Sequence, residues 1–242
     1  MTNSSRVPLI CLLVLGGLVL AATLGAQQRP PIVEQMAKTY GLDSFGQIEA
    51  VRYTFNLELG TFKLSRSWEW EPKTGRVTYE GKDKDGKPVK VTYLRSELSS
   101  QPANVKGEID PSFSNDNYWL IFPFHVSWDT GAKVEDRGMH KLPIGKGSAD
   151  WVVVTYGDGG YTPGDTWELF VGPDKRVKEF VFRHGGNAKP SVVITTWVDY
   201  KKAGPLLVST DHRGTADGKP ARIRLSNVSV KLTGSDAWVD AK

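Results

Sequence analysis

The chain has 242 residues, of which 39% are hydrophobic, 10% aromatic and 24% charged. These fractions are typical of a folded globular protein and exclude a largely disordered chain. Its 31 Lys and Arg residues exceed its 27 Asp and Glu residues by only four, and they form no basic block. The charge pattern therefore gives no support for nucleic-acid binding, and we expect no nucleic acid among the partners.

The first 26 residues differ in composition from the rest of the chain. Arg6 precedes an uncharged apolar run from Val7 to Leu24, and the small residues Gly25 and Ala26 follow this run. This pattern predicts a secretory signal peptide over residues 1–26, cleaved after Ala26. An uncleaved anchor is the alternative, because about 18 apolar residues are just long enough to span a membrane. Either interpretation places residues 27–242 in the periplasm or outside the cell, with membrane contact only through an uncleaved N-terminal segment.

The single cysteine, Cys11, lies inside this apolar run, with Leu9 and Ile10 before it. A lipid-attachment cysteine follows small residues and an apolar run, so we expect no lipid on Cys11. The exported part of the chain would then have neither disulfides nor thiolate metal sites.

Hydrophobic spacing predicts one short helix followed by a series of strands. Apolar residues from Ile32 to Tyr40 recur at helical spacing, and Gly41 ends that helix. Residues from Val51 to Leu59 alternate between apolar and polar, as in a strand with one buried face. The other strand-like segments are Phe62–Trp70, Val77–Tyr79, Val89–Tyr93, Trp151–Tyr156, Thr166–Val171, Val177–Arg183, Val192–Tyr200, Leu206–Thr210 and Arg222–Leu232, with a weaker one at Lys133–Asp136. Within the last long strand, Ser226-Asn227 changes the register and predicts a β-bulge.

A second helix is expected between the two groups of strands, within Asn115 to Asp129. Ser114 or Asn115 would cap its start, and Pro123 would end it. Almost every side of this helix is apolar, so it must be enclosed by other parts of the protein.

Together these elements predict a mainly β protein with about ten or eleven strands. Short connections favour an antiparallel up-and-down order, and a sheet of this size curls because strand twist accumulates. We therefore expect one domain over residues 27–242. It would be a single curved antiparallel sheet or half-open β-barrel, with an N-terminal helix and a central helix filling the concave side.

Three segments stand out beyond their hydrophobic spacing: Asn117-Tyr118-Trp119-Leu120 with Pro123-Phe124, then Gly160-Tyr161-Thr162-Pro163-Gly164-Asp165, and Trp167-Glu168-Leu169-Phe170-Val171. In these segments the chain resembles the LolA-like lipoprotein-carrier superfamily, in particular its exported relatives that are similar to outer-membrane lipoprotein-sorting proteins. The resemblance covers residues 32–232. It implies a half-open barrel packed around helices, with a hydrophobic cavity that receives acyl chains in the carriers.

A set of large apolar residues would converge inside such a half-barrel. These candidate ligand-binding residues are Phe55, Leu57, Trp68, Trp70, Tyr118, Trp119, Phe122, Trp167, Phe180, Phe182 and Trp197. A partly unfilled cavity would let them line a slot for a lipid or another apolar small molecule. Alternatively, they fill the core as ordinary aromatic packing, because filled and hollow barrels share the same alternation.

Catalytic motifs are absent from the sequence, and no histidine pair has metal-ligand spacing. We expect no cofactor and no metal. The main hypothesis is an exported non-enzymatic binding or carrier protein for a lipid or another apolar ligand. One alternative is a filled-core scaffold that interacts with an envelope protein. The other is a hydrolase that uses a carboxylate and a histidine at the barrel mouth, such as Asp165 with His125 or His212.

Overall fold

The computed structural model describes residues 29–83, 85–157, 161, 163–185, 189 and 191–242. The predicted signal peptide or anchor, residues 1–26, and Cys11 lie outside the described residues, so these predictions stay untested. Among the described residues, no helix is both long and apolar enough to cross a membrane.

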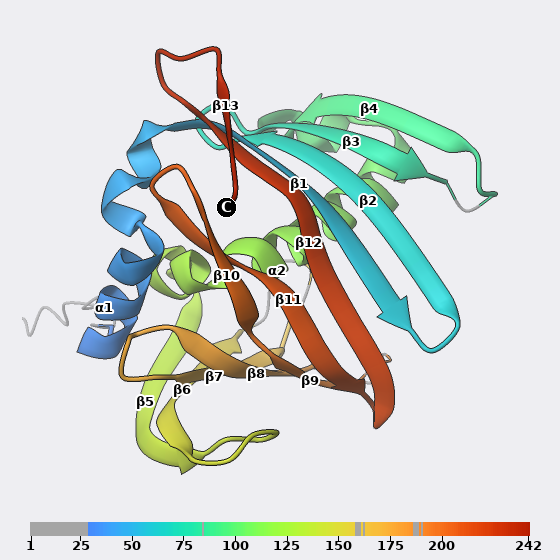
Figure 1. Ribbon diagram of the computed structural model, residues 1–242. Helices are drawn as coiled ribbons and strands as arrows, with labels where there is room; N and C mark the ends of the chain where they lie inside the picture. The colour runs from blue at the N-terminus through green and yellow to red at the C-terminus, as the bar shows by residue number, and fades with distance from the viewer. Residues whose placement is uncertain (1–28, 84, 158–160, 162, 186–188, 190) are drawn as a thin grey trace, which may run out of the picture.

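Thirteen strands of the described chain form one antiparallel sheet that curls without closing (Figure 1). The strands are β1 (Ile48–Leu59), β2 (Phe62–Glu71), β3 (Arg76–Lys82), β4 (Pro88–Leu94), β5 (Ala132–Lys141), β6 (Ser148–Tyr156), β7 (Thr166–Val171), β8 (Val177–Arg183), β9 (Val192–Thr196), β10 (Val198–Ala203), β11 (Leu206–Ala216), β12 (Lys219–Leu232) and β13 (Trp238–Asp240). Their order is β4-β3-β2-β1-β12-β11-β9-β8-β7-β6-β5, with β10 beside β11 and β13 beside β12. The predicted curved antiparallel sheet is confirmed.

The sheet consists of two meanders that are distant in sequence and joined by β11 and β12. Strand β1 pairs along its length with β12, where Phe55 lies opposite Leu225. Strand β11 pairs with both β12 and β9. The expected up-and-down order therefore holds within each meander, whereas long-range pairing joins the two.

Local geometry explains why the strand count exceeds ten or eleven. The expected strand Val192–Tyr200 is split at Trp197, whose backbone N–H donates to the carbonyl of Lys178 at 2.8 Å. The weak segment Lys133–Asp136 is part of the longer β5, and β13 was not predicted. The predicted bulge is confirmed: Asn227 has a left-handed backbone (φ 53°) beside a register shift between β1 and β12.

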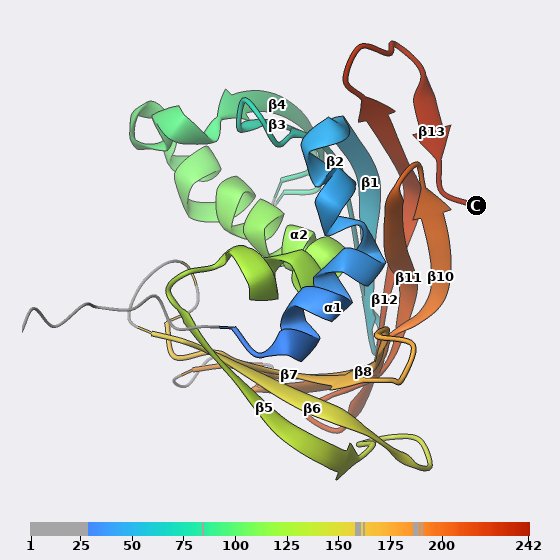
Figure 2. The ribbon, with the colours of Figure 1, turned by 90° about the vertical axis from the view of Figure 1, so that its left-hand side faces the viewer.

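Helix α1 (Pro31–Tyr40) matches the predicted first helix. Gly41 ends it with φ 101°, a conformation that glycine adopts without steric cost. Short helical turns follow at η1 (Leu42–Gln47), η2 (Arg95–Ser100) and η3 (Val105–Ile109), the last of which is a π-helical turn. Figure 2 shows α1 and the central helix on the same side of the sheet.

The central helix, α2 (Asp110–Trp128), is longer at both ends than predicted. The predicted start at Ser114 or Asn115 is wrong because the helix continues directly from η3, with Pro111 in the first turn, where a proline fits. The predicted end at Pro123 is also wrong. A kink at Ile121 (φ −131°, ψ 28°) accommodates the proline, and the helix continues to Trp128.

The concave side of the sheet encloses α2, as its apolar composition predicted. Phe113, Trp119, Leu120, Phe122 and Phe124 are all buried in the main hydrophobic core. Because α2 is covered on nearly every side, packing compensates for the backbone hydrogen bond that Pro123 cannot donate.

Candidate functional site

The predicted ligand-binding residues all belong to the core on the concave side of the sheet or pack against it. Seven are buried: Phe55, Trp68, Trp119, Phe122, Trp167, Phe180 and Trp197. Four are partly buried: Leu57, Trp70, Tyr118 and Phe182. The structure therefore gathers the set in one core, and its role in ligand binding stays a prediction.

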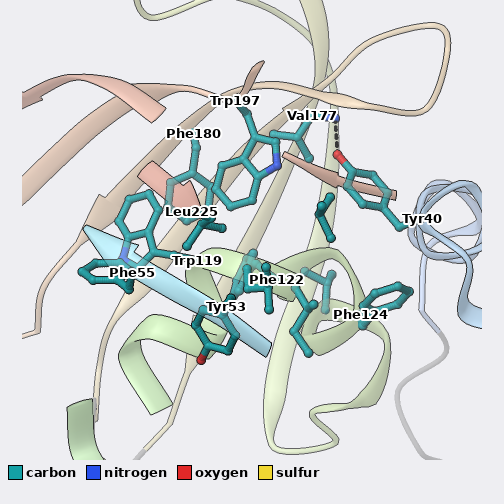
Figure 3. Packing of buried hydrophobic residues seen from close by; sticks show 14 of the residues in the cluster. Tyr40, Tyr53, Phe55, Trp119, Phe122, Phe124, Val177, Phe180, Trp197 and Leu225 are labelled. Carbon is teal, nitrogen blue, oxygen red and sulfur yellow. Dashed lines mark hydrogen bonds between the residues drawn. The ribbon is translucent and has the colours of Figure 1, made fainter. Parts of the chain in front are cut away.

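Trp119 of α2 packs against aromatic rings of the sheet and its connections, among them Phe180 and Trp197 (Figure 3). Its ring centroid is 5.2 Å from that of Phe180, 6.0 Å from that of Trp197 and 6.2 Å from that of Trp167. Phe122 stacks on Trp167 at 4.6 Å. These spacings are those of directly contacting rings, so the space around Trp119 is filled by the protein's own side chains.

Trp68 and Trp70 belong to a second aromatic group. Both indoles contact Phe113 near the start of α2, at centroid distances of 5.4 and 6.0 Å. Trp70 also contacts Phe45. Trp68 and Trp70 therefore meet at Phe113, whereas Trp167, Phe180 and Trp197 meet at Trp119.

A buried ion pair attaches α2 to β2 beside the second group. Arg66 Nε donates to Asp116 Oδ2 at 2.8 Å, and the same carboxylate oxygen accepts from the Trp68 indole N–H at 2.8 Å. The Asp116 side chain is completely buried. Burial raises the pKa of Asp116, and the guanidinium of Arg66 partly offsets this effect. This pairing was not predicted from the sequence.

A second buried carboxylate fixes the start of α2. Asp110 accepts hydrogen bonds from the Tyr93 hydroxyl at 2.8 Å, from Arg95 Nε at 3.0 Å and from the Tyr161 hydroxyl at 2.5 Å. Burial and the Asp110 carboxylate raise the pKa of Tyr161 to about 12. Asp110 thus connects β4 and the segment before β7 to the same helix end.

The end of α2 carries a third polar network. Asp129 Oδ2 accepts from the hydroxyls of Tyr118 at 2.6 Å and Tyr156 at 2.7 Å, while Oδ1 lies 3.2 Å from His125 Nδ1. His125 Nε2 lies 2.8 Å from Asn117 Oδ1. Burial raises the pKa of Asp129, but the hydrogen bonds from His125 and the two tyrosines outweigh it, so the net shift is downward.

The histidines of the hydrolase alternative have partners other than Asp165. Asp165 pairs with His184, at 3.0 Å between Oδ1 and Nδ1, and accepts a backbone N–H from Gly185. His125 pairs with Asp129, and the buried His212 ring lies against Trp197 at 4.1 Å. The pairings that this alternative named, Asp165 with His125 or His212, are not among the contacts of the described residues.

Helix α2 covers only part of the concave face. On β1, the inward-facing residues Val51, Tyr53 and Phe55 are buried, whereas Leu57 and Leu59 on the same face are only partly buried. The apolar surface therefore continues beyond the helix toward the β1–β2 turn.

A groove of about 820 Å³ lies in this uncovered region, between strands β2 to β4 and η3. Its apolar lining comes from Phe62, Leu64, Val89 and Ile109. Phe62 is 55% exposed. Among the described residues that line the groove, none belongs to the predicted set. The alternation from Phe62 to Trp70 was visible in the sequence, but where the covering helix begins was not.

A larger hollow of about 1140 Å³ lies on the opposite face, near β10, β12 and the C-terminal residues. Arg52, Arg222, Arg224 and Asp211 are among the side chains that line it. This polar lining does not suit an apolar ligand. Among the described residues, no group of three or more His, Cys, Asp or Glu residues is arranged to hold a metal ion.

The fold and the groove define a half-open antiparallel barrel with an apolar concave surface. No protein-family model matches the chain, and no curated protein matches its sequence. The chain is similar to the solved structure of a DUF1329 family protein from Desulfovibrio piger, with 13% identity and a TM-score of 0.47, covering 87% of this chain and 97% of that chain. It is also similar to a LolA superfamily protein from Nitrosomonas europaea, with 8% identity and a TM-score of 0.43, covering 82% and 93% of the two chains. The chain is similar as well to the lipoprotein LppX of Mycobacterium tuberculosis, with 10% identity and a TM-score of 0.30, covering 82% of this chain and 95% of that chain.

One of these structures is a LolA superfamily protein, the family that three segments of the sequence resemble. The likeness concerns the fold alone. Ligand and partner are therefore inferred from the geometry of this chain.

Proposed function

We propose that this chain is an exported, non-enzymatic binding protein that carries a lipid or another apolar ligand on the concave side of its half-open barrel. This proposal rests on the groove beside α2. Its volume of about 820 Å³ lies within the usual range for small-molecule sites, and its strands present Phe62, Leu64 and Val89. Covering this apolar surface with a ligand would contribute about 25 cal/mol for each Å² removed from water.

Charges at the groove are balanced, which favours apolar contacts as the main source of affinity. Lys82, Asp83 and Glu108 all line the groove, and Arg66, which also lines it, is already paired with Asp116. The polar side chains of Asn104 and Ser112, which also line the groove, would orient the polar end of a ligand.

The predicted aromatic set forms the inner part of the proposed site. Arg66 lines the groove, whereas its partner Asp116 also binds Trp68 in the aromatic core. The ion pair therefore lies between the groove and the aromatic groups. A ligand longer than the groove would reach the rings beneath α2 only by displacing this ion pair and the closely packed side chains behind it.

The close packing around Trp119 favours the second candidate function, a filled-core envelope scaffold. Trp119 is 4% exposed and Phe122 is completely buried. In that case the groove stays empty, and the protein acts through its surfaces.

Native mass spectrometry of the protein purified from its exporting cell, followed by extraction of bound molecules, tests the two candidates. A stoichiometric apolar ligand supports the carrier. A clean protein mass together with no binding of a fluorescent fatty acid supports the scaffold.

The groove itself is tested with Phe62→Ser. We expect the affinity for the fluorescent fatty acid to fall about fivefold or more, because one large apolar contact is lost. Val198→Ser is the matched control, since Val198 is 39% exposed and lies away from the groove, among the residues of the opposite hollow. Equal affinities for the two variants would contradict the proposed location.

A further inference from the structure

A second exposed apolar feature lies at the end of the β5–β6 hairpin, residues 137–149, called here the β5–β6 tip. Figure 2 shows the connection between these strands projecting beyond the rest of the sheet. Met139 is 67% exposed and Ile144 is 48% exposed. They are two of the six large hydrophobic residues that are exposed in the described part of the chain.

The β5–β6 tip is also basic. Residues 137–149 contain Arg137, Lys141 and Lys146, and no Asp or Glu. At the start of the tip, Arg137 pairs with Glu135, which also pairs with a lysine. Beyond that pair, the two lysines flank the apolar segment Leu142-Pro143-Ile144 without a neighbouring acidic residue in sequence.

A buried carboxylate fixes the conformation of the tip. Glu179 on β8 is 4% exposed, and its two oxygens accept the backbone N–H groups of Ile144 at 2.6 Å and Gly145 at 2.7 Å. A side chain at Gly145 would meet Glu179 Oε1 at 2.8 Å, so glycine permits this close approach. The loop is therefore held in place while Ile144 stays half exposed.

The Leu142 side chain lies on the side of the loop that faces the protein. It packs against the small cluster of Ala149, Phe170 and Val181. Its backbone N–H donates to the carbonyl of Gly147 at 3.1 Å. Several backbone groups of the tip are thus satisfied within the protein, which lowers the cost of moving the tip into a less polar environment.

We propose that the β5–β6 tip docks on an anionic lipid bilayer, with Ile144 and Met139 entering the headgroup region and Lys141 and Lys146 contacting lipid phosphates. Exposed apolar residues flanked by cations are typical of elements that bind at the membrane interface. A bilayer needs no shaped groove, and the charge pattern suits its anionic surface. Membrane contact would then involve the folded domain, beyond the N-terminal segment to which the sequence expectation confined it.

Dye labelling at the tip tests this proposal directly. In a Cys11→Ser background, Ile144→Cys is labelled with an environment-sensitive fluorophore, and Val239→Cys, whose parent residue is 40% exposed, is the control. We expect a blue shift at position 144 with phosphatidylcholine vesicles that contain phosphatidylglycerol, and none at position 239. The shift should weaken as salt is added, because ions screen the attraction. No shift with these vesicles, or equal shifts at both positions, would overturn the proposal, even if the tip proved to bind a protein.

Removing the lysines provides the second test. Each cation near an anionic surface changes the partition coefficient by about fivefold, so Lys141→Gln with Lys146→Gln should lower it by roughly 25-fold. The control is Lys63→Gln with Lys90→Gln, two exposed lysines outside the tip. Unchanged partitioning of the tip variant would overturn the proposal. Binding of the fluorescent fatty acid is measured on the same variant and reports on the groove separately, because the proposed docking does not depend on the proposed ligand.

Discussion

Arg66 on β2 and Asp116 on α2 form a bidentate ion pair on the concave side of the sheet. Arg66 Nε donates to one carboxylate oxygen at 2.8 Å, and Nη2 donates to the other at 2.5 Å. The two side chains are 15% and 0% exposed. Since the same carboxylate also accepts from Trp68, the pair fixes α2 at the point where the groove meets the aromatic core.

Replacing one partner of this pair should strongly destabilise the fold. Arg66→Met leaves the Asp116 carboxylate buried without its cation, and we expect the free energy of unfolding to fall by about 3–5 kcal/mol. Adding Asp116→Leu removes the unpaired charge and should restore much of this loss. Urea denaturation measures both variants. Lys90→Met is the control, because its ion pair with Glu80 is exposed and should contribute less than about 1 kcal/mol. A comparable loss in the control would contradict this assignment.

The core and the groove should respond differently to truncation. Trp119→Ala removes a buried ring that contacts three other aromatic side chains, so unfolding should become easier by roughly 3–5 kcal/mol. Phe62→Ala should cost less than about 1 kcal/mol, because more than half of its surface is already exposed. Thermal and urea unfolding compare the two. A small effect of Trp119→Ala would show that the space around it is not closely filled.

Acid should destabilise the protein through His212. Complete burial lowers the pKa of His212 from 6.5 to about 3, although the Thr196 backbone and Asp211 oppose this shift. As the pH falls below about 6.5, the unfolded chain therefore binds a proton that the folded chain does not, and stability is lost progressively toward pH 3. The loss should reach roughly 2–3 kcal/mol at about pH 4.5.

His212→Phe tests this titration, because phenylalanine fills the site without binding a proton. The difference in unfolding free energy between about pH 7.5 and pH 4.5 should shrink by roughly 2–3 kcal/mol relative to the parent. An identical acid sensitivity of His212→Phe and the parent would assign the effect to other groups.

Gly214 should be required for the stability of the fold, because it lies where the two meanders join. It lies on β11 opposite Thr195 of β9, and an added Cβ would lie 1.8 Å from the backbone oxygen of Ile194. Gly214→Ala should therefore lower the free energy of unfolding by roughly 3 kcal/mol or more, because backbone atoms must move. Gly131→Ala is the control, since a Cβ there meets no atom within 4 Å. Circular dichroism during thermal unfolding measures both, and equal melting temperatures would refute the steric argument.

The spacing of apolar residues predicted most elements of the fold, because it reflects which side of each helix or strand is buried. The alternation from Val51 to Leu59 matches β1, and the apolar positions from Ile32 to Tyr40 match α1. Prediction failed where tertiary contacts override local preference. Pro123 ends an isolated helix, but enclosure by the sheet allows α2 to continue to Trp128.

The candidate site was predicted only in part. The sequence indicated which aromatic residues face inward, because alternation assigns each strand residue to a face. It did not indicate how far α2 extends over that face, so the groove beside Phe62 and Leu64 was missed. The partners of the buried charges were also missed, since Arg66 and Asp116 are 50 residues apart and their pairing depends on how the helix lies on the sheet.

The sequence by itself determined the class of structure: a curved antiparallel sheet, an amphipathic first helix and a central helix that must be enclosed. These features follow from hydrophobic spacing along short segments. Only the tertiary structure decided that β1 pairs with β12, that Trp119 is closely packed and that an apolar groove remains open beside η3. Such features depend on contacts between distant segments, whose register and relative position no local pattern encodes.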